Sequence, residues 1–145
     1  MATLTMTTHH TPTPRFQPFV RVAVGLQTAT ILAQAISAGL AFTTSYGELL
    51  HSVGARVTYG ATMLYVLAAV LAWRPGGGSA RPVLYATGFL LLSSLQVVAG
   101  VSHWAGLHVP LGVLMFGGSL LRLGLDLARY RADAAAAGDG GVSRT

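Results

Sequence analysis

The feature that most constrains this chain is residues 82–121, a run of 40 positions without Arg, Lys, Asp or Glu. A single helix of that length would extend about 60 Å, twice the ~30 Å hydrocarbon core of a bilayer. The run must therefore fold back on itself. The break is predicted at residues 102–106, where Ser-His-Trp-Ala-Gly precedes Pro110. This predicts two membrane-spanning helices, at about 82–102 and 107–130.

Two more spans are expected upstream. Residues 22–46 carry no charge. A cleavable signal peptide is the competing interpretation, with residues 33–35 as a possible cleavage site. The uncharged run is longer than the 7–15 apolar residues of a signal peptide, which favours a helix that stays in the membrane. A second stretch between Arg56 and Arg74 holds 17 uncharged residues and ends at Trp73. Helices at about 20–44 and 50–73 are therefore predicted.

Composition supports a membrane protein. Hydrophobic residues make up 52% of the chain and charged residues 9%, whereas soluble domains carry about a quarter charged residues. The net charge of +5 comes from dispersed arginines, which argues against nucleic acid as a partner. The expected fold is all-α: a polytopic up-down four-helix bundle in a lipid bilayer over residues 19–131. A disordered tail (1–18) and a flexible tail (132–145), with fraying near Gly138, would flank it.

Charge distribution predicts the orientation. Seven arginines precede the first helix, join the second to the third, or follow the fourth: Arg15, Arg21, Arg74, Arg81, Arg122, Arg129 and Arg131. The other two connections carry no Arg. By the positive-inside rule both termini are cytoplasmic. The absence of Lys beside abundant Ala, Gly and Arg favours a bacterial source, and hence the bacterial inner (cell) membrane.

Two histidines are the candidate metal ligands. His51 opens the second helix and His108 opens the fourth, so both are expected at similar depth near the outer face. Alternate helices of a bundle face each other on a diagonal, which is about 1.4 times the 8–10 Å spacing of neighbours. That gap suits a haem with one imidazole on each side of the iron. His103, beside Trp104, is assigned to the loop.

Helical steps of three and four from each histidine reach small or mildly polar residues, which would leave room for a flat macrocycle. Such stripes also serve plain helix packing in membranes, and the first helix shows one at residues 25, 29, 33, 37 and 41. Intramembrane amides could bond across the bundle or toward a free histidine nitrogen. Arg56 could meet Glu48 or a haem propionate. Arg122 and Asp126 should pair. The candidate cofactor-binding residues are His51, His108, Arg56, Gly112, Met115, Thr58, Thr62, Gln34 and Gln96.

An internal echo suggests two duplicated helix pairs. Residues 34–39 (Gln-Ala-Ile-Ser-Ala-Gly) precede His51, and residues 96–100 (Gln-Val-Val-Ala-Gly) precede His108, with Gly54 and Gly112 following. Glu48-Leu49-Leu50-His51 resembles the Glu-x-x-His that opens the second helix of a haem A synthase half, and His108 matches that family's fourth-helix histidine. The chain also resembles short four-helix bacterial membrane proteins that share Gln…Ala-Gly…His…His-x-Pro-x-Gly.

The resemblance to haem A synthase implies a four-helix half-bundle that binds haem over residues 20–130, and implies a role for Glu48 in oxidising a haem methyl group. Ser52 stands where that family has Arg. The expected function is binding of a b-type haem (haem b) between the second and fourth helices, for electron transfer or haem handling. One alternative is a cofactor-free accessory protein that binds partner helices. Another is a haem A synthase-like enzyme completed by homodimerisation.

Overall fold

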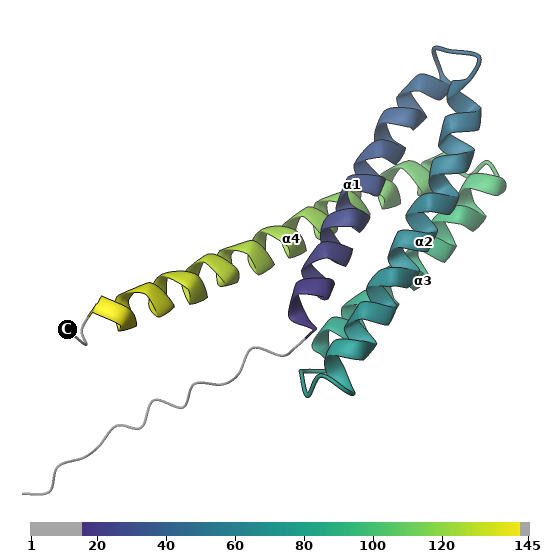
Figure 1. Cartoon of the computed structure of the whole chain (residues 1–145). Helices are drawn as coiled ribbons and strands as arrows, with labels where there is room; N and C mark the ends of the chain where they lie inside the picture. The colour runs from purple at the N-terminus through teal and green to yellow at the C-terminus, as the bar shows by residue number, and fades with distance from the viewer. Residues whose placement is uncertain (1–15, 143–145) are drawn as a thin grey trace, which may run out of the picture.

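The computed structural model describes residues 16–142, and every regular element in that range is a helix. The four helices are α1 (Gln17–Ala41), α2 (Gly47–Trp73), α3 (Arg81–Val101) and α4 (Ala105–Val142). All four are long and apolar enough to cross a membrane. The predicted all-α four-helix bundle is confirmed (Figure 1).

Proline and glycine define the ends of these helices. Pro18 and Pro82 each lie in a first turn, where the missing N–H leaves no helical bond unmade. In the connection between α2 and α3, Gly77 adopts a φ of 67°, which glycine tolerates without steric cost. His103 has a φ of 56° in the turn between α3 and α4, and a residue in that region cannot continue a right-handed helix. The predicted break after residue 101 is therefore present.

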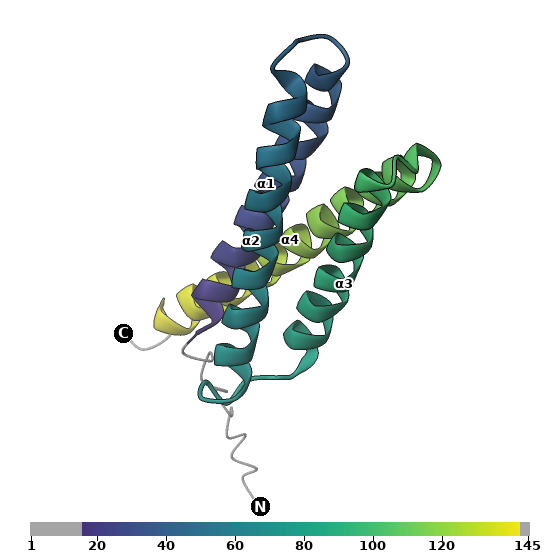
Figure 2. The ribbon, with the colours of Figure 1, turned by 90° about the vertical axis from the view of Figure 1, so that its right-hand side faces the viewer.

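The helices form a four-membered ring. α1 packs against α2 and α4, and α3 packs against the same two helices, so α2 and α4 lie on a diagonal. Sequential helices are neighbours, as the up-down connectivity predicts. Figure 2 shows two hairpins, α1–α2 and α3–α4, that diverge toward their turns. This ring places the helices that carry the two histidines on opposite sides of the bundle axis.

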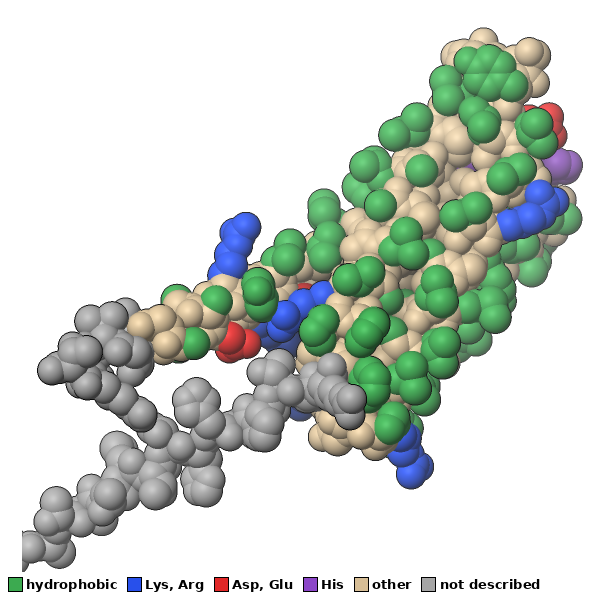
Figure 3. Space-filling view, in the orientation of Figure 1, with side chains coloured by type: hydrophobic (Ala, Val, Ile, Leu, Met, Phe, Trp, Pro, Cys, Tyr) green, Lys and Arg blue, Asp and Glu red, His purple; other side chains and the backbone are tan. Residues whose placement is uncertain are grey.

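The distribution of side chains is that of a membrane protein. Of the 12 buried hydrophobic residues in the described part of the chain, seven are alanine, and the buried polar residues are Gln, Ser and Thr. Large apolar side chains such as Leu84, Leu91 and Leu114 are instead mostly exposed. Figure 3 shows hydrophobic side chains along the whole length of the visible face. Small residues inside and leucines outside are typical of helices that pack in lipid.

Helix bounds differ from the predicted ones mainly at the two ends of the chain. α1 begins at Gln17, so residues 17 and 18 belong to a helix and not to the predicted disordered tail. The rest of that tail, residues 1–15, lies outside the described residues. α4 begins at Ala105, which puts Pro110 inside the helix rather than in its first turn.

α4 also continues to Val142, so the expectation of a flexible tail from residue 132 is wrong for residues 132–142. The helix does not end near Gly138. Residues 134–137 are four consecutive alanines, the best helix formers, and they carry the helix past the membrane-spanning segment. Residues 131–138 are exposed, and the end of α4 projects beyond the bundle (Figure 1).

Candidate functional site

The two predicted ligands meet across the diagonal of the bundle. The ring centroids of His51 and His108 lie 6.1 Å apart, and the ring planes are inclined by 76°. An iron–imidazole bond is about 2 Å long and the ring centroid lies about 1 Å behind the ligating nitrogen, so two axial imidazoles on one iron have centroids about 6 Å apart. Because each ring can rotate about its own iron–nitrogen bond, near-perpendicular planes are compatible with axial ligation.

A hydrogen bond determines the tautomer of each ring. Nδ1 of His108 lies 3.0 Å from the backbone oxygen of Gln96, which can only accept, so Nδ1 carries the proton. Nδ1 of His51 lies 3.1 Å from the Ser37 hydroxyl. That hydroxyl donates its single proton to the Gln34 carbonyl oxygen at 3.0 Å, so it must accept from His51. In both rings the unprotonated nitrogen is therefore Nε2, the state in which a neutral histidine binds a metal.

Glycine makes room for these side chains. A Cβ at Gly100 would lie 3.0 Å from Cε1 and 3.1 Å from Nδ1 of the His108 ring, so the ring packs directly on the α3 backbone. A Cβ at Gly54 would overlap the Gln34 amide, and a Cβ at Gly112 would lie 2.8 Å from Nε2 of Gln96. The two hairpins thus repeat one arrangement, with a glutamine amide lying on a glycine one turn after the histidine. This repetition agrees with the sequence echo.

The glutamine amides do not orient the histidines, contrary to one of the predictions. Nε2 of Gln34 and Oε1 of Gln96 are buried and have no hydrogen-bond partner among the described residues. The orienting groups are instead the Ser37 hydroxyl and the Gln96 main chain. Each amide instead lies against a glycine of the neighbouring helix, Gly54 or Gly112.

Several predicted residues line the interior between the histidines and the opposite end of the bundle. Thr62 is completely buried, and its hydroxyl donates to the Thr58 carbonyl oxygen at 3.0 Å. Thr58 is half-buried and its own hydroxyl has no partner among the described residues. Met115 is 5% exposed, and Gly112 is half-buried. The inward faces predicted for α2 and α4 are thus the faces that the bundle buries.

Arg56 and Glu48 do not lie in the buried interior of the bundle. Both residues are exposed. Arg56 follows His51 by five residues, which at 100° per residue places it well round the helix on the outer face. Glu48 and Arg56 are eight residues apart, about 12 Å along the axis of α2. The ion pair between them that the sequence suggested therefore does not form. The predicted pair Arg122–Asp126 is present, with Nε 3.1 Å from Oδ2.

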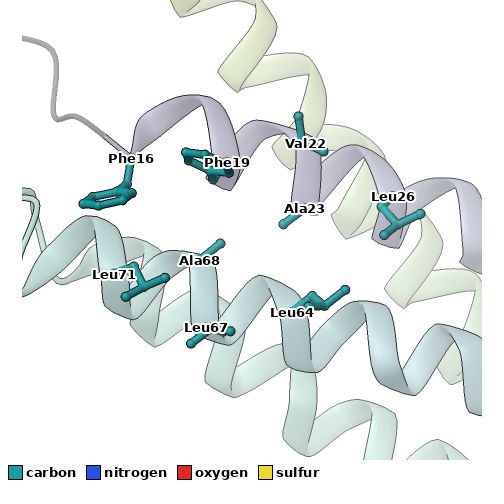
Figure 4. Close-up of a pocket in the computed structure, with 9 residues that line it drawn as sticks. All are labelled: Phe16, Phe19, Val22, Ala23, Leu26, Leu64, Leu67, Ala68 and Leu71. Carbon is teal, nitrogen blue, oxygen red and sulfur yellow. The ribbon is translucent and has the colours of Figure 1, made fainter.

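Two grooves lie between α1 and α2 rather than between the histidines. The larger, of about 310 Å³, faces outward and is lined only by apolar side chains of the two helices, among them Phe19, Leu26 and Leu64 (Figure 4). The second, of about 270 Å³, is lined near the turn by Gln34, Ser37 and their neighbours. In a bilayer the first groove would face lipid, and it offers no polar group for binding a cofactor.

The sequence patterns missed Gln27 and the orienting role of Ser37. Gln27 is 1% exposed and is the largest fully buried side chain in the described residues, and Ser37 orients His51. The stripe predicted on α1 is wrong in its middle, because Ala29 and Ala33 are exposed. α1 turns its polar residues inward instead. Gln27 falls seven residues before Gln34, a two-turn spacing that could have identified this face.

Comparison of the chain with protein-family models, curated proteins and solved structures finds no match. The resemblance to haem A synthase therefore stays a prediction. In the described residues no group of three or more His, Cys, Asp or Glu could hold a metal ion on protein ligands alone. Two convergent imidazoles can nonetheless hold an iron whose other four ligands come from a porphyrin.

Proposed function

We propose that this protein is a multi-pass membrane protein that binds one b-type haem between α2 and α4, with His51 and His108 as axial ligands, for electron transfer or haem handling. The observation that carries this proposal is the 6.1 Å separation of the two ring centroids, combined with hydrogen bonds that leave Nε2 of both rings unprotonated. Side chains that merely pack together have no need of matched tautomers.

The residues around the pair suit that cofactor. Ser37 and the Gln96 carbonyl oxygen hold the Nδ1 protons, which orients both imidazoles and raises their basicity as ligands. Gly100 lets the His108 ring lie on the α3 backbone. When bound, the haem would supply one-electron chemistry at its iron. The protein would contribute ligand orientation and a setting of low polarity.

The orientation follows from the arginines. We propose that the turns before α2 and α4 face the outside of a bacterial inner membrane and that both termini are cytoplasmic. Arg74 and Arg81 flank the α2–α3 loop, whereas the α1–α2 turn contains no basic residue. The histidine pair would then lie near the outer face, one to two helical turns below the membrane surface.

An absorbance spectrum tests the haem proposal. Protein expressed in haem-replete bacteria and purified in detergent should show a Soret band, a low-spin bis-imidazole spectrum and one haem per chain. His51→Ala and His108→Ala should each abolish the bis-imidazole spectrum, because each removes one axial ligand. His103→Asn is the matched control: His103 is an exposed histidine in the α3–α4 turn, and Asn tolerates its positive φ.

Other outcomes would select among the alternatives. A colourless preparation, or a spectrum that survives loss of both ligands, would contradict haem binding and favour a cofactor-free protein that binds partner helices. Extraction of hydroxymethyl or formyl haem from expressing cells would favour the haem A synthase-like alternative. In that case the mass of the complex in detergent would show whether a homodimer replaces the missing half.

A further inference from the structure

Polar side chains are buried at several places in the interior of the bundle. Six buried polar side chains from all four helices are each 6% exposed or less, and we call them the polar seam: Gln27, Thr28, Thr62, Tyr65, Ser93 and Ser119. One hydrogen bond crosses the seam, between the Thr28 and Ser119 hydroxyls at 2.7 Å. Serine and threonine are common where membrane helices pack, whereas a buried glutamine and a buried tyrosine bring larger polar groups that need hydrogen-bond partners.

Several atoms of the polar seam lack partners. Oε1 of Gln27, the Tyr65 hydroxyl and Oγ of Ser93 are buried without a hydrogen bond to any described residue. They come from three different helices. Lipid offers these groups no hydrogen-bond partner, and leaving them unpaired is costly. Buried water that makes two to four hydrogen bonds is the usual resolution in a polar interior.

The polar seam lies between the histidine pair and the Arg122–Asp126 pair. Thr62 and Ser119 lie 11 residues after His51 and His108 respectively, which puts both about 16 Å below the histidines. Asp126 lies 18 residues after His108, about 27 Å away, compared with a hydrocarbon core of ~30 Å. Polar groups therefore occur about halfway between the histidine pair and Asp126, and again at Asp126.

The far end of the polar seam carries charges. Asp126 pairs with Arg122, whose guanidinium lies 5.2 Å from the centre of the Tyr85 ring. The Tyr65 hydroxyl lies near this ion pair. On the α1 side, the neighbouring cation is Arg21, which lies over the ring of Tyr130. A carboxylate beside a buried phenol is an arrangement that can receive and release protons.

We propose that the polar seam holds a file of water molecules and conducts protons between the Arg122–Asp126 end and the histidine end of the bundle. Hydroxyl and amide groups both donate and accept hydrogen bonds, so they can keep such a file continuous. A proton entering the file at one end releases another proton at the opposite end, and no bond to the protein needs to change. This activity does not require haem.

Proton flux into liposomes tests the proposal. The full-length protein is reconstituted into liposomes that contain a pH-sensitive dye, and a potassium diffusion potential drives proton entry. Thr62→Val keeps the shape of the most deeply buried residue of the polar seam but removes its hydroxyl. It should lower the flux about tenfold, equivalent to about 1.4 kcal/mol in barrier. Ser119→Ala should act in the same direction. Thr87→Val, an exposed threonine on α3, is the matched control and should leave the flux unchanged.

Circular dichroism and elution volume in detergent establish that each variant is folded. A wild-type flux equal to that of protein-free liposomes would overturn the proposal. So would folded Thr62→Val and Ser119→Ala variants that conduct like the wild type. A Soret spectrum recorded on the same sample separates this result from the haem proposal, because a colourless protein that conducts, or a haem-loaded protein that does not, defeats only one of the two.

Discussion

Replacing Ser37 with alanine isolates the contribution of an orienting group to the proposed haem site. The Ser37 hydroxyl is buried and accepts the hydrogen bond of the His51 Nδ1 proton at 3.1 Å. Ser37→Ala leaves that N–H inside the bundle without an acceptor, which costs about 1–3 kcal/mol. The His51 ring can form a new hydrogen bond only by rotating, and such a rotation would turn its Nε2 away from His108.

The expected effect is a weaker complex and not a loss of folding. Removing an outer partner of a ligating histidine typically costs about 10–100-fold in metal affinity, and each tenfold corresponds to about 1.4 kcal/mol. The cost of the unpaired N–H group and the expected loss of metal affinity are therefore of similar size. The test is possible only on this side of the site, because the partner of His108 is a main-chain oxygen that no side-chain substitution removes.

Titration of haem into the haem-free protein, followed at the Soret band, measures the dissociation constant. Ser37→Ala should raise it about 10–100-fold. Ser52→Ala is the matched control, because Ser52 adjoins His51 in sequence but is exposed, and its constant should stay within about twofold. Equal constants for Ser37→Ala and the wild type would refute the reasoning that the serine orients the ligand.

Two further predictions concern the fold and its orientation. Gly47→Ala should lower the free energy of unfolding by about 2 kcal/mol or more in denaturant titrations, because its methyl group would overlap the Leu40 main chain in the α1–α2 turn. Gly60→Ala is the control, because there is open space around Gly60, and it should be neutral or slightly stabilising. Equal losses of stability in the two variants would contradict the packing argument. The chain has no cysteine, so a membrane-impermeant maleimide should label Ser45→Cys in intact spheroplasts and Ser79→Cys only after lysis, and the reverse pattern would invert the proposed topology.

The helices were predictable because the position of a membrane-spanning helix depends on the length and composition of an apolar segment more than on contacts with distant residues. The ends of α2 and α3 fall within three residues of the predicted bounds. The end of α4 differs from the prediction because a glycine such as Gly138 often ends a helix, whereas the four alanines before it stabilise the helix here. At this position the helix propensity of the preceding alanines has a larger effect than the single glycine.

The candidate site was only partly predictable. Equal placement of His51 and His108 on parallel helices follows from topology, and the echo of Gln and Gly in both hairpins pointed to the same pairing. The role of Arg56 in the site stays a prediction, and the structure shows only that this residue is exposed. Ser37 and Gln27 were missed because a helix in lipid shows weak amphipathicity, so the pattern along α1 does not reveal which face is buried.

The sequence by itself determined four membrane-length helices, their order, and the level at which the two histidines enter the bundle. These properties depend on chain length, charge-free runs and turn residues, all of which are local. Only the tertiary structure decided that the two rings approach to 6.1 Å, that a serine hydroxyl and a main-chain oxygen hold their Nδ1 protons, and that unpaired polar groups line the interior. Those properties depend on how four helices rotate and cross, which is determined by packing between residues far apart in the chain.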